Sequence, residues 1–135
     1  MKSKIDEIAK YHGNEQKAFV LKELGDLSRF RVYGNRVLVV TYIQPSISRG
    51  GILFTPAQTD ESIYQGKVGY IIKKGPLAYV DDATTKFGGI NPEVGAWVFY
   101  RPSLAIMQLR YDGIDCRMFA DEQIGGDLLD PEKMW

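Results

Sequence analysis

After residue 30 the chain consists of short runs of β-branched and aromatic residues, separated by Gly, Pro, Asn or Asp. The residues of the runs favour strands, and the separating residues favour turns. The predicted strands cover residues 36–42, 67–72, 96–100, 104–111 and 114–119, and Asp112-Gly113 predicts a hairpin turn between the last two. Because no helical pattern lies between these strands, we expect an all-β domain, either a barrel or a sandwich.

Residues 1–29 differ from the rest of the chain, because their apolar residues recur at helical spacing. The pattern predicts two short amphipathic helices separated at Gly13-Asn14, and Gly25 suits the C-terminal cap of the second. We therefore expect a helical N-terminal extension over residues 1–29. Two arrangements are open. Either the helices pack on the following domain or a neighbouring subunit, or they form a solvated, partly frayed extension.

Composition argues against several classes of protein. The formal net charge is zero and no basic stripe is present, which argues against a nucleic-acid partner. The longest apolar runs are shorter than a membrane span, and the first residues carry charges where a secretion signal needs an apolar segment. We expect a cytoplasmic protein with no membrane partner. The single cysteine, Cys116, cannot form an internal disulfide and is expected to be a small buried or half-buried strand residue.

No combination of residues indicates an enzyme. The only histidine, His12, has no serine and aspartate arranged with it as in a catalytic triad. Neither a cluster of metal-ligand residues nor the phosphate-binding motif Gly-x-x-x-x-Gly-Lys-Ser/Thr is present. We expect no catalytic activity, no metal and no cofactor. The acidic residues Asp81-Asp82, Asp127 and Asp130 are expected to be solvated loop charges.

Two long excursions interrupt the predicted strands. Residues 46–65 read SISRGGILFTPAQTDESIYQ, and a loop of about twenty residues inside a compact domain is usually functional or disordered. In it Gly50-Gly51 precedes Ile52-Leu53-Phe54, three apolar side chains that cannot all reach the domain's own core. We expect them to bind another protein; the alternative is a strand edge packed against the chain's own barrel. The second excursion, residues 77–92, is expected to form a hairpin with Phe87 near its tip.

Residues 31–124 resemble the GroES-type co-chaperonins. The segments that carry the resemblance follow in the family's order: Asn35-Arg36-Val37-Leu38-Val39, Ser48-Arg49-Gly50-Gly51-Ile52-Leu53-Phe54, Gln65-Gly66-Lys67-Val68, Val94-Gly95 with Trp97-Val98-Phe99, and residues 115–124 with their short helical turn. The resemblance implies an all-β domain over residues 30–124, a GroES-like partly open β-barrel. In it residues 45–65 are the mobile loop and residues 77–92 are the roof, and an acidic C-terminal tail over residues 125–135 follows.

The resemblance also implies a function in binding. The apolar residues Ile52, Leu53 and Phe54 would dock in a groove of a GroEL-type chaperonin ring, and Gly50-Gly51 would let the chain turn there. The protein would form a homo-oligomeric ring, by family a heptamer, that caps the chaperonin and assists protein folding. ATP would be bound and hydrolysed by the chaperonin, and not by this chain.

Two features depart from the family. The helical extension is additional, and Gly125-Gly126-Asp127 is expected to interrupt the last strand, which in the family pairs with the next subunit. With these departures, the chain resembles a divergent viral or phage member of the family, which would act in the host cytoplasm. The alternative function is structural. The same GroES-like barrel would be a virion protein, for capsid decoration or head–tail connection, with capsid proteins as its partners.

Overall fold

The computed structural model describes residues 7–43, 45 and 67–134. One α-helix, α2 (Gly13–Leu24), precedes the strands in this part of the chain. The strands are β1 (Arg36–Thr41), β2 (Val68–Lys74), β3 (Trp97–Tyr100), β4 (Met107–Tyr111), β5 (Ile114–Ala120) and β6 (Ile124–Leu128). Three short 3₁₀ turns, Pro102–Leu104, Asp121–Gln123 and Pro131–Met134, complete the regular structure.

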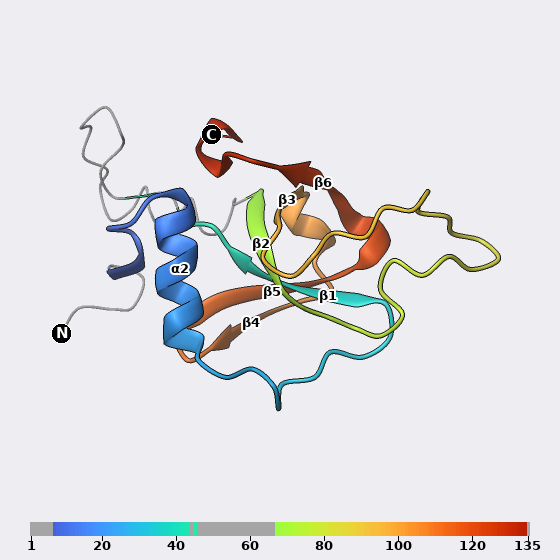
Figure 1. Cartoon of the computed structure of the whole chain (residues 1–135), viewed down its shortest axis with the longest axis horizontal. Helices are drawn as coiled ribbons and strands as arrows, with labels where there is room; N and C mark the ends of the chain where they lie inside the picture. The colour runs from blue at the N-terminus through green and yellow to red at the C-terminus, as the bar shows by residue number, and fades with distance from the viewer. Residues whose placement is uncertain (1–6, 44, 46–66, 135) are drawn as a thin grey trace.

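The strands form a single antiparallel sheet in the order β4-β5-β1-β2-β3-β6 (Figure 1). The expected β-rich fold is therefore confirmed. The described strands do not close into a barrel, because β4 and β6 are the two edges of the sheet. The central strand β1 is buried on both faces from Val37 to Thr41, as its nearly continuous run of apolar residues requires.

Most predicted strands lie where the sequence indicated. The exception is the predicted strand at 104–111, which begins only at Met107, because Pro102–Leu104 form a 3₁₀ turn with the proline in its first turn. The predicted hairpin at Asp112-Gly113 is confirmed. Both residues have positive φ, 52° and 78°, as a two-residue type I′ turn requires. The predicted helical turn after β5 is also present, at Asp121–Gln123.

The prediction that Gly125-Gly126-Asp127 interrupts a strand is wrong. These residues belong to β6, which pairs with β3 in the same chain and crosses the expected start of the C-terminal tail. The glycines are needed because the Phe99 ring of β3 lies against them. A Cβ atom on Gly126 would come within 2.5 Å of Phe99 Cζ, and one on Gly125 within 3.2 Å of the same ring.

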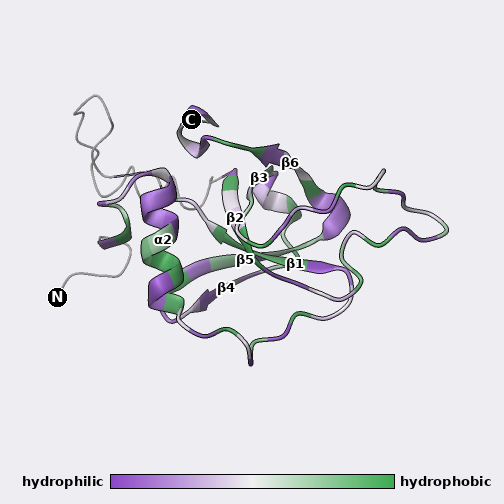
Figure 2. Cartoon of the chain, in the orientation of Figure 1, coloured by the Kyte–Doolittle hydropathy of each residue, from purple (hydrophilic) through white to green (hydrophobic). Residues whose placement is uncertain are grey.

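The sheet buries an apolar cluster on each face. The larger cluster lies beneath α2 and joins Ile8, Val20 and Leu24 to alternate residues of β1, β2 and β5. Figure 2 shows the apolar residues along β1 and β5 and on one side of α2. The helix thus packs on the sheet, the first of the two expected arrangements, and Gly25 ends it with φ 66°. No helix among the described residues is long and apolar enough to cross a membrane.

The second cluster lies on the opposite face and contains Val37, Val39, Ile71, Ala78, Val98, Tyr100 and Phe119. The loop between β2 and β3 extends from the sheet (Figure 1). The hairpin predicted over residues 77–92 is wrong, because this segment contains no strand. Phe87 instead packs edge-on against Tyr79, with the ring centroids 5.2 Å apart.

Candidate functional site

The predicted partner-binding residues, Gly50, Gly51, Ile52, Leu53 and Phe54, lie outside the described residues. The structure does describe the strands from which their segment leaves and to which it returns. Thr41 at the end of β1 is paired with Gly69 at the start of β2. One step further, the Tyr42 N–H donates to the Val68 carbonyl (2.9 Å). Both ends of the excursion are therefore held at the same end of the β1–β2 ladder.

A side chain of α2 holds the chain immediately before the excursion. Gln16 is fully buried, and its amide forms two hydrogen bonds with the backbone of Ile43. Gln16 Oε1 accepts the Ile43 N–H (3.0 Å), and Gln16 Nε2 donates to the Ile43 carbonyl (2.8 Å). Sequence reasoning missed this residue. The available signal was its spacing, because Gln16 is a polar residue in line with Val20 and Leu24 on the buried side of the helix.

The first turn of α2 is also attached to β3. The Trp97 indole N–H donates to Asn14 Oδ1 (2.8 Å), and the Lys17 ammonium lies 5.1 Å from the centre of the Trp97 ring. Lys17 also donates to the Gly95 carbonyl (2.8 Å), and partial burial lowers its pKa. On the β1 side, the Gly13 N–H donates to the Tyr42 hydroxyl (2.9 Å). The extension is therefore part of the scaffold that positions the excursion.

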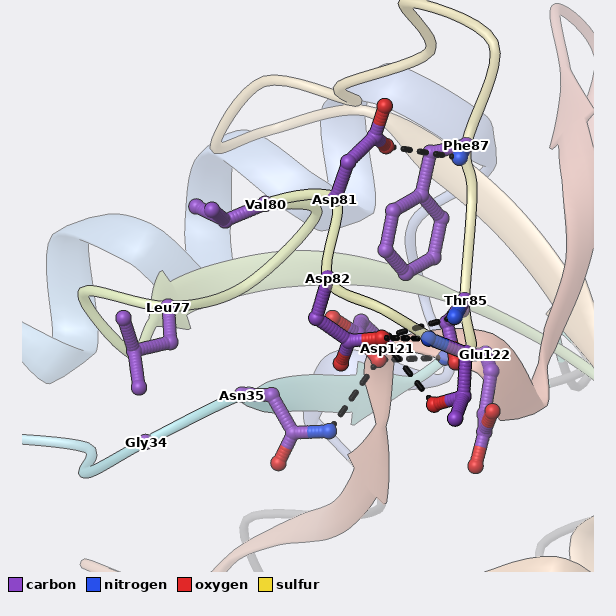
Figure 3. A pocket seen from close by; sticks show the side chains of 11 residues that line it. Gly34, Asn35, Leu77, Val80, Asp81, Asp82, Thr85, Phe87, Asp121 and Glu122 are labelled. Carbon is purple, nitrogen blue, oxygen red and sulfur yellow. Dashed lines mark hydrogen bonds between the residues drawn. The ribbon is translucent and has the colours of Figure 1, made fainter.

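A cavity of about 550 Å³ lies beneath the loop after β2 and contains several carboxylates (Figure 3). Two of them shape the loop. Asp82 Oδ1 accepts the backbone N–H groups of Thr84 (2.8 Å) and Thr85 (2.7 Å), and these bonds lower the pKa of Asp82. Asp81 Oδ1 accepts the Phe87 N–H (2.8 Å). Asp81 and Asp82 are both exposed, as predicted, but their hydrogen bonds also stabilise the conformation of the loop.

The buried carboxylate of this cavity, Asp121, joins three segments. It accepts hydrogen bonds from the Asn35 amide (3.2 Å), the Tyr79 N–H (2.9 Å) and the Glu122 N–H (2.7 Å). Tyr79 has a positive φ of 61°, a conformation that costs free energy for a residue with a side chain. The carboxylates of Asp81, Asp82 and Asp121 thus accept hydrogen bonds that hold the loop after β2 in its conformation. In the described part of the chain, no group of three or more His, Cys, Asp or Glu residues could hold a metal ion.

A second groove lies on the sheet face opposite α2. It has a volume of about 460 Å³ and is lined by Lys67, Arg101, Pro102, Ser103, Ala105, Gln108 and Arg117. We call it the basic groove, because three of these residues are cationic and none is acidic. Arg117 is only 3% exposed, and the Asp115 carboxylate next to it only 2%. Sequence reasoning missed this pair, although the alternation along β5 places Asp115 and Arg117 on one face.

Several buried polar groups surround Arg117. Arg117 Nε lies 3.7 Å from Asp115 Oδ2, which is too long for a hydrogen bond. The other Asp115 oxygen accepts from the Gln108 amide (2.7 Å). The buried hydroxyls of Thr41 and Tyr100 have no hydrogen-bond partner of good geometry among the described residues. Burial raises the pKa of Tyr100, and the charge of Arg117 opposes that shift.

Cys116 has the buried position predicted for it and is fully inaccessible. Burial, together with the neighbouring Asp115 carboxylate, raises the pKa of its thiol to about 12. A thiol with this pKa is neutral at pH 7 and is a poor nucleophile.

No model of a known protein family matches the chain, and no curated protein matches it either.

Proposed function

We propose that the protein is a GroES-like co-chaperonin that caps a GroEL-type chaperonin ring and so assists protein folding. One observation carries the proposal. The segment with the sequence Gly50-Gly51-Ile52-Leu53-Phe54 begins and ends at one end of a paired β1–β2 ladder. A rigid base of this kind, together with the order of the sequence segments around it, supports a binding loop presented by a β scaffold.

The energetics of such a loop explain why it would act as part of a ring. Burying one apolar side chain of this size is worth about 1.5–3 kcal/mol, whereas fixing each loop residue costs roughly 1–2 kcal/mol. A single loop therefore binds weakly. A ring of identical loops makes later contacts intramolecular, and avidity adds a factor of about 10²–10⁴. A lid held in this way releases when the chaperonin weakens each contact slightly.

The free edge of β6 is consistent with the proposed homo-oligomeric ring. β6 is an edge strand, and no strand lies beside its outer side in the described residues. Such an edge can accept a strand from a second copy. A contact between two different surfaces of the same chain repeats around an axis and closes into a ring when the rotation permits.

The test is to mix the purified protein with a GroEL-type ring and ATP and to examine the particles by electron microscopy. We expect capped rings, refolding of a stringent substrate, and loss of both with Ile52→Ser. Ile90→Ser is the matched control, because Ile90 is an exposed isoleucine in the other long loop. Native mass spectrometry should show a ring-sized oligomer. If the wild-type protein never caps, or if Ile52→Ser behaves like wild type, the co-chaperonin proposal fails and the virion-protein alternative gains support.

A further inference from the structure

The two edge strands of the sheet match each other in length and direction. β4 and β6 each have five residues, and in the described part of the chain no strand lies on the outer side of either. Every neighbouring pair in the six-stranded sheet is antiparallel, so β4 and β6 run in opposite directions. A second copy placed beside the first, with its sheet in the same orientation, therefore presents its β6 to β4 as an antiparallel partner.

Both edges carry apolar side chains on the same face of the sheet. Leu109 and Tyr111 of β4 and Leu128 of β6 all pack against the apolar cluster beneath α2. Met107 shares this face, because side chains alternate along a strand, and it is 50% exposed. A sheet that continues from one copy into the next would therefore place apolar side chains beside apolar side chains.

A groove beside β6 lies on this face. It has a volume of about 470 Å³, and its lining includes Asn14 of α2, Trp97, Leu128 and Leu129. Leu129, directly after β6, is 95% exposed. A strand paired with the outer side of β6 would cover the apolar wall of this groove, and the removal of apolar surface from water favours association.

Charge on the other face of the sheet selects the register. Arg110 of β4 and Asp127 of β6 are both exposed, and alternation places them on the face opposite α2. Registers that keep the two faces matched differ by two residues. One of them places Arg110 opposite Asp127, whereas a shift by two residues places either Asp112 or Gln108 there. Only the first register pairs opposite charges, which stabilises neighbouring strands.

We propose that β4 of one copy of the chain pairs with β6 of the next copy, with Arg110 opposite Asp127 and Leu109 opposite Leu128. The contact joins two different surfaces, so it repeats from copy to copy and closes into a ring when the rotation permits. It rests on the homo-oligomeric ring of the proposed function and names the surface that the edge of β6 meets. Pairing of β4 with a second β4 would leave β6 and its groove uncovered.

Cysteine cross-linking of the full chain tests the register. The double variant Arg110→Cys/Asp127→Cys is oxidised and separated on a denaturing gel without reductant. The two new thiols lie on opposite edges of one sheet, so a disulfide between them must join two copies, and we expect a ladder of covalent oligomers. Cys116 does not interfere, because it is fully buried.

The matched control, Gln108→Cys/Asp127→Cys, is shifted by two residues and should give few cross-links. An equal or stronger ladder from this control would overturn the register. Each single variant can form dimers at most. Efficient dimers from Arg110→Cys alone, without a ladder from the double variant, would show that β4 pairs with β4 and would overturn the proposal.

Reversal of charge tests the pairing without new thiols. Arg110→Glu and Asp127→Arg each bring like charges together, so each should raise the protein concentration at half-assembly about tenfold in sedimentation velocity. The double variant Arg110→Glu/Asp127→Arg restores opposite charges and should assemble like wild type. Arg31→Glu is the matched control, because Arg31 is exposed and belongs to neither edge strand. A monomeric wild-type protein, or a double variant no better than the single variants, would overturn the contact.

Capping of a GroEL-type ring is measured on the same samples, which separates this contact from the proposed function. An oligomer that caps but is insensitive to these substitutions rejects the contact between β4 and β6 and keeps the co-chaperonin. An oligomer that responds to them as expected but never caps keeps the contact and rejects the co-chaperonin.

Discussion

The Gln16 side chain forms two hydrogen bonds with the backbone of Ile43, one to its N–H and one to its carbonyl. The amide therefore pairs with the chain as a neighbouring strand would, but from a helix. Ile43 lies shortly before the excursion, so a residue of the N-terminal extension holds the chain at the point from which the excursion follows.

Replacing Gln16 with leucine should destabilise the protein by about 2–4 kcal/mol. The reason is that the buried N–H and carbonyl of Ile43 both lose their partner, and an unpaired buried polar group costs about 1–3 kcal/mol. Urea unfolding would measure the loss, and the Ile43 amide should exchange with solvent faster. Glu15→Ala is the control, because Glu15 is exposed on the same helix. If Gln16→Leu and wild type are equally stable, the two hydrogen bonds between Gln16 and Ile43 contribute nothing to the stability of the protein.

Replacing Gly126 with alanine should destabilise β6 by about 1–3 kcal/mol, the usual cost of overpacking. The added Cβ would stand 2.5 Å from Phe99 Cζ, so the ring or the strand must move. Thermal unfolding of Gly126→Ala would show the effect, with Asp127→Ala as the control at the next, exposed position of β6. The double variant Gly126→Ala/Phe99→Leu should recover part of the loss. If it does not, the contact with the ring is not the cause.

Replacing Asp121 with alanine should cost about 2–4 kcal/mol, because three donors lose an acceptor that carries a charge. Asp121→Asn keeps one acceptor oxygen and should cost less. The neighbouring Glu122 is exposed, so Glu122→Ala should leave the unfolding midpoint nearly unchanged. Proteolysis of the loop after β2 offers a second measurement. If a protease cuts that loop at the same rate in Asp121→Ala and in wild type, Asp121 does not hold Tyr79 in place.

Stability should fall at alkaline pH because of Cys116. Its pKa is raised from 9.0 to about 12 on folding, so between these values the unfolded chain has lost the thiol proton that the folded protein retains. The stabilisation is complete below about pH 9 and is lost as the pH rises toward 12, with a slope of about 1.4 kcal/mol per pH unit. Urea unfolding at several values between pH 8 and 11 would measure this slope. The slope should be smaller for Cys116→Ala, and identical slopes would remove Cys116 as the cause.

The sequence predicted those parts of the fold that depend on neighbouring residues. The hairpin at Asp112-Gly113 requires positive φ, which these residue types accept, and the run of apolar residues in β1 requires burial. The prediction failed where the deciding partner is distant in sequence. The glycines of β6 suggest a break until the Phe99 ring is known to lie against them. For the same reason, the helical spacing of Gln16 indicates that it is buried but does not reveal its polar partner, Ile43, which lies 27 residues further along the chain.

The order of the strands also has a consequence for synthesis. β1 lies between β2 and β5, and Arg36 of β1 is paired with Ala120 of β5. One side of the central strand therefore has no partner until β5, which ends at Ala120, has left the ribosome. Contacts between residues so far apart in sequence slow folding, and the apolar faces of β1 stay open to other molecules during that time. A protein that we propose assists the folding of others would thus itself complete its central sheet only after β5 has been made.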